Sequence, residues 1–200
     1  MSTDELVRMR LKMEFGVPVH GDTLPSATLN LDGQPRLIVS RHRDGGSMFF
    51  RHDVPEETRA RLRRLGVERG LVDENAVREV LGQARNVWRV CWYTVERRPE
   101  TDAFPDVVLR DGRHVVLIDG VVAAQAWTTA ESERAVEVEV ETHPDYRRRG
   151  LAAQVVSAWA ASEVGRGRVA FYSHLAENEA SAGVARRLGL VWLSDEVEFQ

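Results

Sequence analysis

The 200-residue sequence has little cysteine and no long uninterrupted apolar run, and each shortage excludes a class of protein. Cys91 is the only cysteine, so neither an intrachain disulfide nor a thiolate-rich zinc site can form. Charged residues interrupt the apolar residues of the N-terminus, which leaves no stretch of signal-peptide or membrane-span length. We therefore expect a cytoplasmic protein with no membrane partner and no metal.

Lysine is equally scarce, because Lys12 is the only lysine among 27 basic residues. The formal net charge is -4 and the arginines are spread along the chain. An arginine-rich codon supply explains this bias more simply than a nucleic-acid surface does, and we expect no nucleic-acid partner. With 43% hydrophobic residues, the chain can bury a core, and its length suits one domain or a domain with a smaller appendage. Cys91 lies in an apolar strand pattern over 87–95, which favours a small buried side chain over a nucleophile.

The first part of the chain alternates helix and strand signals. Apolar residues within 3–15 predict an amphipathic helix that ends at Gly16. Two apolar triplets around Asp44-Gly45-Gly46 predict a hairpin over 37–50. A cap, an early proline and early acidic residues predict a helix over 55–65, and Asp73 begins a second one.

From about residue 87 the pattern changes to strands joined by Asp-Gly turns. The composition changes near Gln83 to Asn86, so we expect one domain over 1–86 and another over 87–200. The predicted strands are 87–95, 107–109, 115–118, 121–127, 135–142, 169–173 and 190–199. Helices are predicted over 150–164 and 178–188. The strand 135–142 alternates strictly, which places Glu137, Glu139 and Glu141 on one face if the strand has no bulge.

A basic, glycine-containing turn joins the strand 135–142 to the next helix. The segment from His143 to Ala152 reads His-Pro-Asp-Tyr-Arg-Arg-Arg-Gly-Leu-Ala. Unpaired N–H groups at the start of a helix attract anions, and Gly150 allows a ligand to approach the backbone. The segment therefore predicts a site that can hold a pyrophosphate. The alternative is a solvated basic turn that caps an ordinary helix.

This turn, together with the later run from Asn178 to Leu190, closely resembles the GNAT superfamily of acyl-CoA-dependent N-acetyltransferases. The phrase His-Pro-Asp-Tyr-Arg-x-x-Gly-x-Ala is a common form of that family's cofactor motif. The resemblance is strong over about 134–192 and consistent in element order back to about 87. It implies a mixed, mostly antiparallel α/β sheet with a splayed strand pair, plus an N-terminal α/β extension that supplies part of the acceptor cleft.

The resemblance also implies which residues would bind acetyl-CoA. The pantetheine arm would take main-chain bonds from Val140 and Thr142, and the amide of Val140 would face the thioester carbonyl. The later motif would contribute Asn178 and Ser181, although Asn178 can equally be a plain helix cap. The residues expected around the pyrophosphate are Arg147, Arg148, Arg149, Gly150, Leu151, Ala152 and Ala153.

Catalysis in this family needs a base for the amine, and a carboxylate on the strand 135–142 often supplies it. We take Glu137 or Glu139 as the base, although a solvated acidic face explains each of them too. Many members carry a tyrosine acid where this chain has Ala185. Tyr172 and His174 lie nearby in sequence, and packing or surface roles are typical of such residues.

These observations lead to two hypotheses. The first is an N-acetyltransferase that acts on a primary amine of an unidentified small molecule or protein, as a monomer or a homodimer. The alternative is a non-catalytic module of the same fold that binds acyl-CoA as a sensor or interaction partner, which the absence of the tyrosine would favour.

Overall fold

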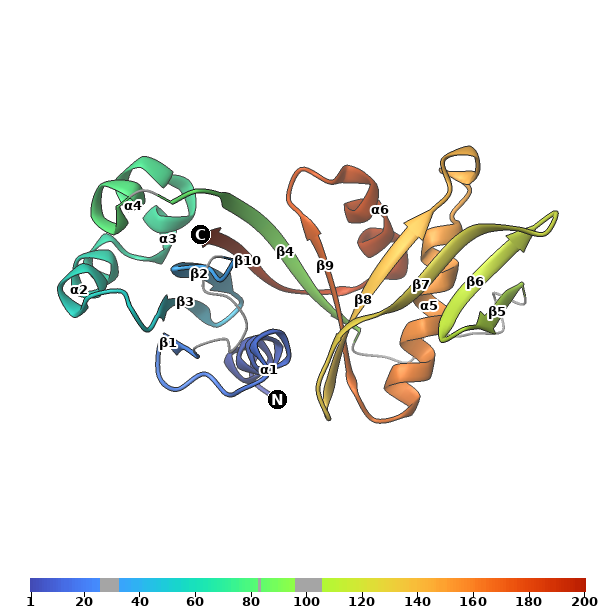
Figure 1. The fold of residues 1–200 in the computed structure, drawn as a ribbon, viewed down its shortest axis with the longest axis horizontal. Coiled ribbons are helices and arrows are strands. Elements are labelled where there is room, and N and C mark those ends of the chain that lie inside the picture. The colour runs from blue at the N-terminus through green and yellow to red at the C-terminus, as the bar shows by residue number, and fades with distance from the viewer. Residues whose placement is uncertain (26–32, 83, 96–105) are drawn as a thin grey trace. The chain divides into compact units, whose positions relative to one another are not determined.

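A computed structural model describes residues 1–25, 33–82, 84–95 and 106–200. The chain divides into two compact units, whose elements are labelled in Figure 1. Unit 1 comprises Met1–Trp92, Leu175–Glu177 and Leu193–Gln200. Unit 2 comprises Tyr93–His174 and Asn178–Trp192. The strands β4 (Val87–Val95), β9 (Val169–Leu175) and β10 (Val191–Phe199) contribute residues to both units.

The compact units are not the same partition as the expected domains 1–86 and 87–200. The difference comes from β10, in which Ser194 to Phe199 pair antiparallel with β2 (Leu37–His42). Such a pairing between distant segments leaves no local composition signal. Gln83, beside the expected boundary, lies outside the described residues. The expected contribution of 1–86 to an acceptor cleft stays a prediction.

Unit 1 is built on a mixed set of strands. Their order is β1 (Thr23–Leu24), β3 (Gly45–Arg51), β2 and β10. β1 runs parallel to β3, and the other neighbours are antiparallel. The hairpin expected over 37–50 is therefore confirmed, and it lies between β1 and β10.

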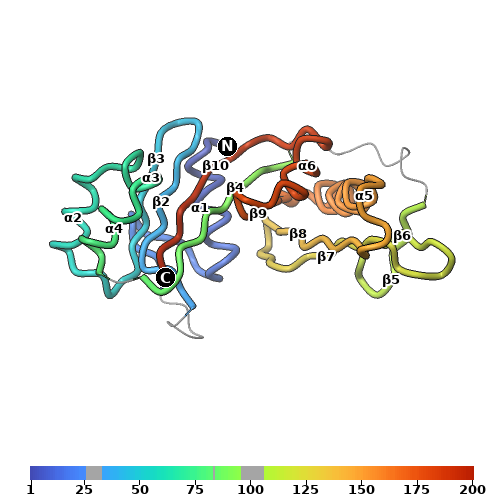
Figure 2. The backbone as a smooth tube through the Cα atoms, turned by 90° about the horizontal axis from the view of Figure 1, so that it is seen from above, coloured from blue at the N-terminus to red at the C-terminus, as the bar shows by residue number. Residues whose placement is uncertain are grey.

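Helices lie against both faces of these strands, as the tube in Figure 2 lets the reader follow. On one face, α2 (Glu56–Leu65), α3 (Val67–Val72) and α4 (Glu74–Leu81) enclose an apolar core with β2, β3 and β10. On the other face lies α1 (Thr3–Phe15), which begins with a capping box between Ser2 and Glu5. The helices expected over 3–15, over 55–65 and from Asp73 are confirmed, whereas α3 was not expected.

A buried ion pair connects α1 to β10. The guanidinium of Arg10 bonds the carboxylate of Glu196, and both side chains are fully buried. The hydroxyls of Ser40 and Ser194 donate to the other oxygen of Glu196 at 3.0 and 3.1 Å. The ring of Trp92 lies 4.5 Å from the Arg10 guanidinium. Cation and anion thus satisfy each other away from water.

Unit 2 contains the strands from β5 to β9. Their order is β9, β8 (Ala135–Thr142), β7 (Val121–Glu131), β6 (Arg113–Ile118) and β5 (Val107–Arg110). β8 and β9 are parallel, and the remaining neighbours are antiparallel. The α/β class with a mixed, mostly antiparallel sheet is confirmed.

One face of this sheet packs against α5 (Leu151–Gly165), beside which α6 (Glu179–Leu188) lies in Figure 1. Val136 and Val138 of β8 meet Val155, Val156 and the fully buried Trp159 of α5. The indole N–H of Trp159 donates to the hydroxyl of Thr128 at 3.0 Å. These contacts hold the middle of α5 against β8 and β7. Among the described residues, no helix has the length and apolar character needed to cross a membrane.

Candidate cofactor cleft

The two parallel strands of unit 2, β8 and β9, separate after a short paired stretch. The register pairs only Ala135, Val136 and Glu137 of β8 with Val169, Ala170 and Phe171 of β9. Beyond this point, the hydroxyl of Ser173 donates to the carboxylate of Glu137 at 2.7 Å. The remainder of β8, from Val138 to Thr142, keeps its partner β7 and has no described pairing with β9. The splayed strand pair that the resemblance implied is present.

The turn after β8 leads into α5 through two residues with left-handed backbone. A short 3-10 helix, η2 (Pro144–Tyr146), follows His143. Arg148 has a φ of 62°, and Gly150, the N-cap of α5, has a φ of 78°. No side chain caps this helix, and its first backbone bond runs from the Gln154 N–H to the Gly150 carbonyl. The N–H groups of the first turn therefore point out of the helix toward any anion placed there.

A cavity of about 610 Å³ joins this helix start to the end of β8 and to α6. Ten of the residues expected to bind acetyl-CoA line it, namely Val140, Thr142, Arg147, Arg148, Gly150, Leu151, Ala152, Ala153, Asn178 and Ser181. Arg149 does not line it, because its guanidinium donates to the Asp145 carbonyl at 3.3 Å and stacks over Tyr146. Five residues that the sequence did not predict to bind the cofactor complete the lining, namely Glu141, Ala180, Gly183, Val184 and Arg187.

The start of α6 closes the cavity beside a buried tyrosine. The side chain of Asn178 accepts the Ser181 N–H at 3.1 Å, so Asn178 is the helix cap. The hydroxyl of Tyr172 donates to the Ser181 carbonyl at 3.1 Å. Burial raises the pKa of this hydroxyl above its usual range, and Tyr93 and Glu139 act in the same direction. Ala185, where the family often has tyrosine, is buried in the apolar core.

The acidic residues of β8 share the sheet face opposite α5. β8 is regular along its length, because the extra residue of the β7–β8 ladder lies in β7, between Thr128 and Ala130. Glu137 is half-buried, and Glu139 and Glu141 are exposed. Of the three, only Glu141 lines the 610 Å³ cavity. The two candidate bases, Glu137 and Glu139, therefore lie nearer the start of β8, away from the turn that follows it.

An aromatic side chain accompanies these carboxylates. Trp127 of β7 is the direct cross-strand partner of Glu139. The guanidinium of Arg113 lies 4.4 Å above the Trp127 ring and donates to Gln125 at 3.0 Å. Gln125 in turn donates to Glu141 at 2.9 Å. Carboxylates beside the face of an indole ring create a local environment that attracts cations.

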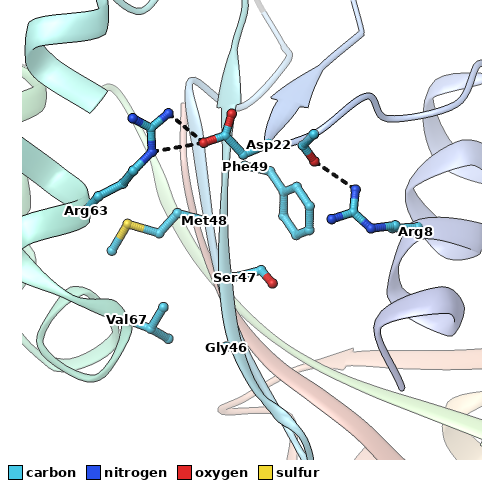
Figure 3. Close-up of a pocket in the computed structure, with 9 residues that line it drawn as sticks. Arg8, Asp22, Gly46, Ser47, Met48, Phe49, Arg63 and Val67 are labelled. Carbon is cyan, nitrogen blue, oxygen red and sulfur yellow. Dashed lines mark hydrogen bonds and ion pairs between the residues drawn. The ribbon is translucent and has the colours of Figure 1, made fainter. Parts of the chain in front are cut away.

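Unit 1 has a smaller cavity of about 330 Å³, which Figure 3 shows between α1, β3 and the helices α2 and α3. Two guanidinium groups line it. Arg63 donates twice to the carboxylate of Asp22, at 3.0 and 2.6 Å. Arg8 pairs with Asp4 at 2.8 Å and donates to the Gly21 carbonyl. Because both cations already have carboxylate partners, we assign no ligand to this cavity.

Nothing in the described parts of the chain brings together three or more His, Cys, Asp or Glu side chains that could hold a metal ion. The lone Cys91 is partly buried, and burial, with a contribution from Asp195, raises its pKa to about 11. A thiol with so high a pKa is a poor nucleophile near neutral pH.

The splayed strands and the uncapped start of α5 define a protein of the GNAT fold. The GNAT acetyltransferase family model matches residues 112–194, which include both motifs. Through this segment the chain is similar to the GNAT superfamily, whose chemistry is acetyl transfer. No curated protein matches the chain.

Solved structures of the same fold carry the same family description. A GNAT-family acetyltransferase from Novosphingobium aromaticivorans is 23% identical with a TM-score of 0.51, over 58% of this chain and 65% of that chain. This likeness shows the fold. A GCN5-related N-acetyltransferase-like protein from Streptococcus suis is 15% identical with a TM-score of 0.48, and the match covers 100% of both chains.

Proposed function

We propose that the protein is an N-acetyltransferase that moves an acetyl group from acetyl-CoA to a primary amine of a small molecule or a protein. The observation that carries the proposal is the 610 Å³ cavity, into which the uncapped first turn of α5 opens beside Arg147 and Arg148. Backbone N–H groups, a helix dipole and guanidinium groups together favour a diphosphate. The cosubstrate would supply an acyl thioester, which an amine can attack directly.

The residues around the cleft fit that cosubstrate. Gly150 leaves the backbone of the first turn open to close approach, and Ala152 and Ala153 keep the lining small. Val140 and Thr142 lie on the part of β8 that has left β9, where an extended ligand can pair with the strand. The N–H of Val140 is our candidate for the donor that stabilises the oxyanion.

The acidic face of β8 suits a cationic acceptor. Glu139 or Glu137 would take the proton from the ammonium group of the amine, directly or through water. The Arg113 guanidinium over Trp127, beside Glu139, indicates that this face accommodates a cation. Tyr172 is poorly suited to protonate the leaving thiolate, because burial raises its pKa and its hydroxyl already donates to Ser181. Solvent can protonate a thiolate without it.

The test is a thiol-release assay with acetyl-CoA across classes of amine, followed by Glu137→Gln and Glu139→Gln on the best acceptor. At least one of the two variants should lose about 10²-fold in kcat/KM, the usual size of a general-base contribution. The loss should shrink as rising pH deprotonates the amine in solution. Glu133→Gln is the control, since it removes an exposed carboxylate that does not line the cavity, and Glu141→Gln tests the third carboxylate of the strand face. If only Glu141→Gln loses activity, our choice of base is wrong.

A specific observation favours the alternative of a non-catalytic acyl-CoA-binding module. Ala185 packs in the core where the family often has its tyrosine acid. In that case calorimetry would detect binding of acetyl-CoA, and the thiol-release assay would show no turnover with any class of amine.

A further inference from the structure

The last turn of α6 lies over the first residue of the α5 start. An ideal Cβ atom built on Gly150 would lie 2.8 Å from Nη1, 3.0 Å from Cζ and 3.1 Å from Nη2 of Arg187. All three of its nearest atoms belong to this guanidinium. Arg187 therefore packs its charged end directly on Gly150, from a helix that follows α5 by a whole strand in the sequence. With any residue that has a Cβ at position 150, the guanidinium of Arg187 would have to shift.

Arg187 has no ion pair or hydrogen bond with any other described residue, whereas its sequence neighbour Arg186 lies 3.7 Å from the carboxylate of Glu179. The surroundings of Arg187 carry an excess of positive charge, because Arg147 and Arg148 line the same cavity, Glu141 is the one carboxylate among its lining residues, and the first turn of α5 carries the positive end of a helix dipole. Cations in excess of the nearby carboxylates repel one another. An anion in the cleft would convert this repulsion into attraction.

We propose that Arg187 binds the diphosphate of the cosubstrate from the α6 side, opposite the backbone N–H groups of α5. This inference rests on the proposed function. A guanidinium presents two parallel N–H donors, which match two oxygens of a phosphate group. The diphosphate would then join α5 to α6, and Arg187 would contribute more to its binding than Arg149, which is turned away to Asp145 and Tyr146.

The test measures binding of CoA itself by titration calorimetry, so that it does not depend on turnover. Arg187→Gln should weaken CoA binding by at least about tenfold, the size expected when a charge-assisted hydrogen bond is lost, and should reduce the salt dependence of binding. Arg187→Lys should recover only part of the lost CoA affinity, because lysine keeps the charge but lacks the two parallel N–H donors of a guanidinium. Arg186→Gln is the matched control, because Arg186 is adjacent in sequence, also exposed and outside the cavity lining, and this variant should bind CoA as the parent does.

Fragments of CoA that lack one or more of its phosphates show which phosphate Arg187 contacts. The loss caused by Arg187→Gln should persist with dephospho-CoA, which keeps the diphosphate, and vanish with pantetheine, which has none. A loss that vanishes with dephospho-CoA would assign Arg187 to the 3′-phosphate and overturn the proposal. So would an Arg187→Gln variant that binds CoA as tightly as the parent, or an equal loss in Arg186→Gln.

The same titrations separate this proposal from the proposed function. A parent protein that binds CoA through Arg187 but releases no thiol with any amine would leave the Arg187 contact standing and refute the transferase. A parent protein that does not bind CoA would refute both.

Discussion

Substitutions at Gly150 should separate backbone strain from exclusion of the cosubstrate. Gly150 has a φ of 78° and a ψ of 8°, a left-handed conformation that costs an L-residue with a Cβ about 1–2 kcal/mol. Gly150→Ala and Gly150→Val should both lose about this much stability in the absence of ligand. The added Cβ also meets the Arg187 guanidinium at 2.8 Å. That contact adds little, because the end of a flexible side chain can move aside.

Cosubstrate affinity should respond more strongly than stability. The two branches of a valine would hold a diphosphate away from the first-turn N–H groups of α5, so Gly150→Val should lose at least about 2 kcal/mol of CoA binding, roughly thirtyfold in Kd. Gly150→Ala should lose less. Urea unfolding measures the strain, and calorimetry with CoA measures the affinity.

Gly167→Ala provides the control for strain alone. Gly167 has a φ of 79°, an added Cβ there would meet nothing within 4 Å, and it does not line the cavity. It should lose the same stability with no change in CoA affinity. Our account is refuted if Gly150→Val binds CoA as tightly as the parent while Arg147→Ala abolishes binding, because the arginine would then outweigh the backbone.

Three further predictions concern other groups. Arg10→Met should lower the free energy of unfolding, measured in urea, by about 3–5 kcal/mol, because it leaves the Glu196 carboxylate buried without its cation. Adding Glu196→Gln should restore part of the lost stability, and a double variant whose loss equals the sum of the two single losses would contradict this prediction. Burial raises the pKa of Cys91 to about 11, so at pH 8 the thiol should react with iodoacetamide more slowly in the folded protein than in the unfolded chain, and equal rates would refute this. The contribution of this thiol to stability should be present below the pKa of the unfolded chain and lost as the pH rises toward 11. Tyr172→Phe removes one hydrogen bond to the Ser181 carbonyl, so it should cost about 1 kcal/mol of stability and leave turnover within about twofold; a dead enzyme would make Tyr172 the acid.

Much of unit 2 follows from local sequence signals. Strict alternation over 135–142 predicts both the strand and the shared face of its three glutamates, and β8 is regular enough to keep that parity. Helix starts in both units follow from side chains that cap them, such as Asp73 in unit 1 and Asn178 in unit 2. These signals act within a few residues, so a single sequence is sufficient to read them.

Close packing between distant segments could not be read in the same way. The helix α3 was missed because Gly70 lies within it, and glycine disfavours helices. The structure gives the reason for this glycine, since a Cβ there would lie 3.2 Å from Val39 and 3.3 Å from Met48. Arg187 was missed for a related reason. An exposed arginine near a helix end is ordinary, and only the fold brings it to Gly150.

The pairing of β10 with β2 has a consequence for synthesis on the ribosome. Val197 and Phe199 of β10 lie in the same apolar core as Leu37, Val39 and the helices α2 to α4. Residues 1–92 emerge first, yet they cannot complete that core until residue 199 has left the exit tunnel. By then all of unit 2 has been translated. The nascent N-terminal part must therefore wait, with an exposed strand edge on β2, while the segment translated after it can fold.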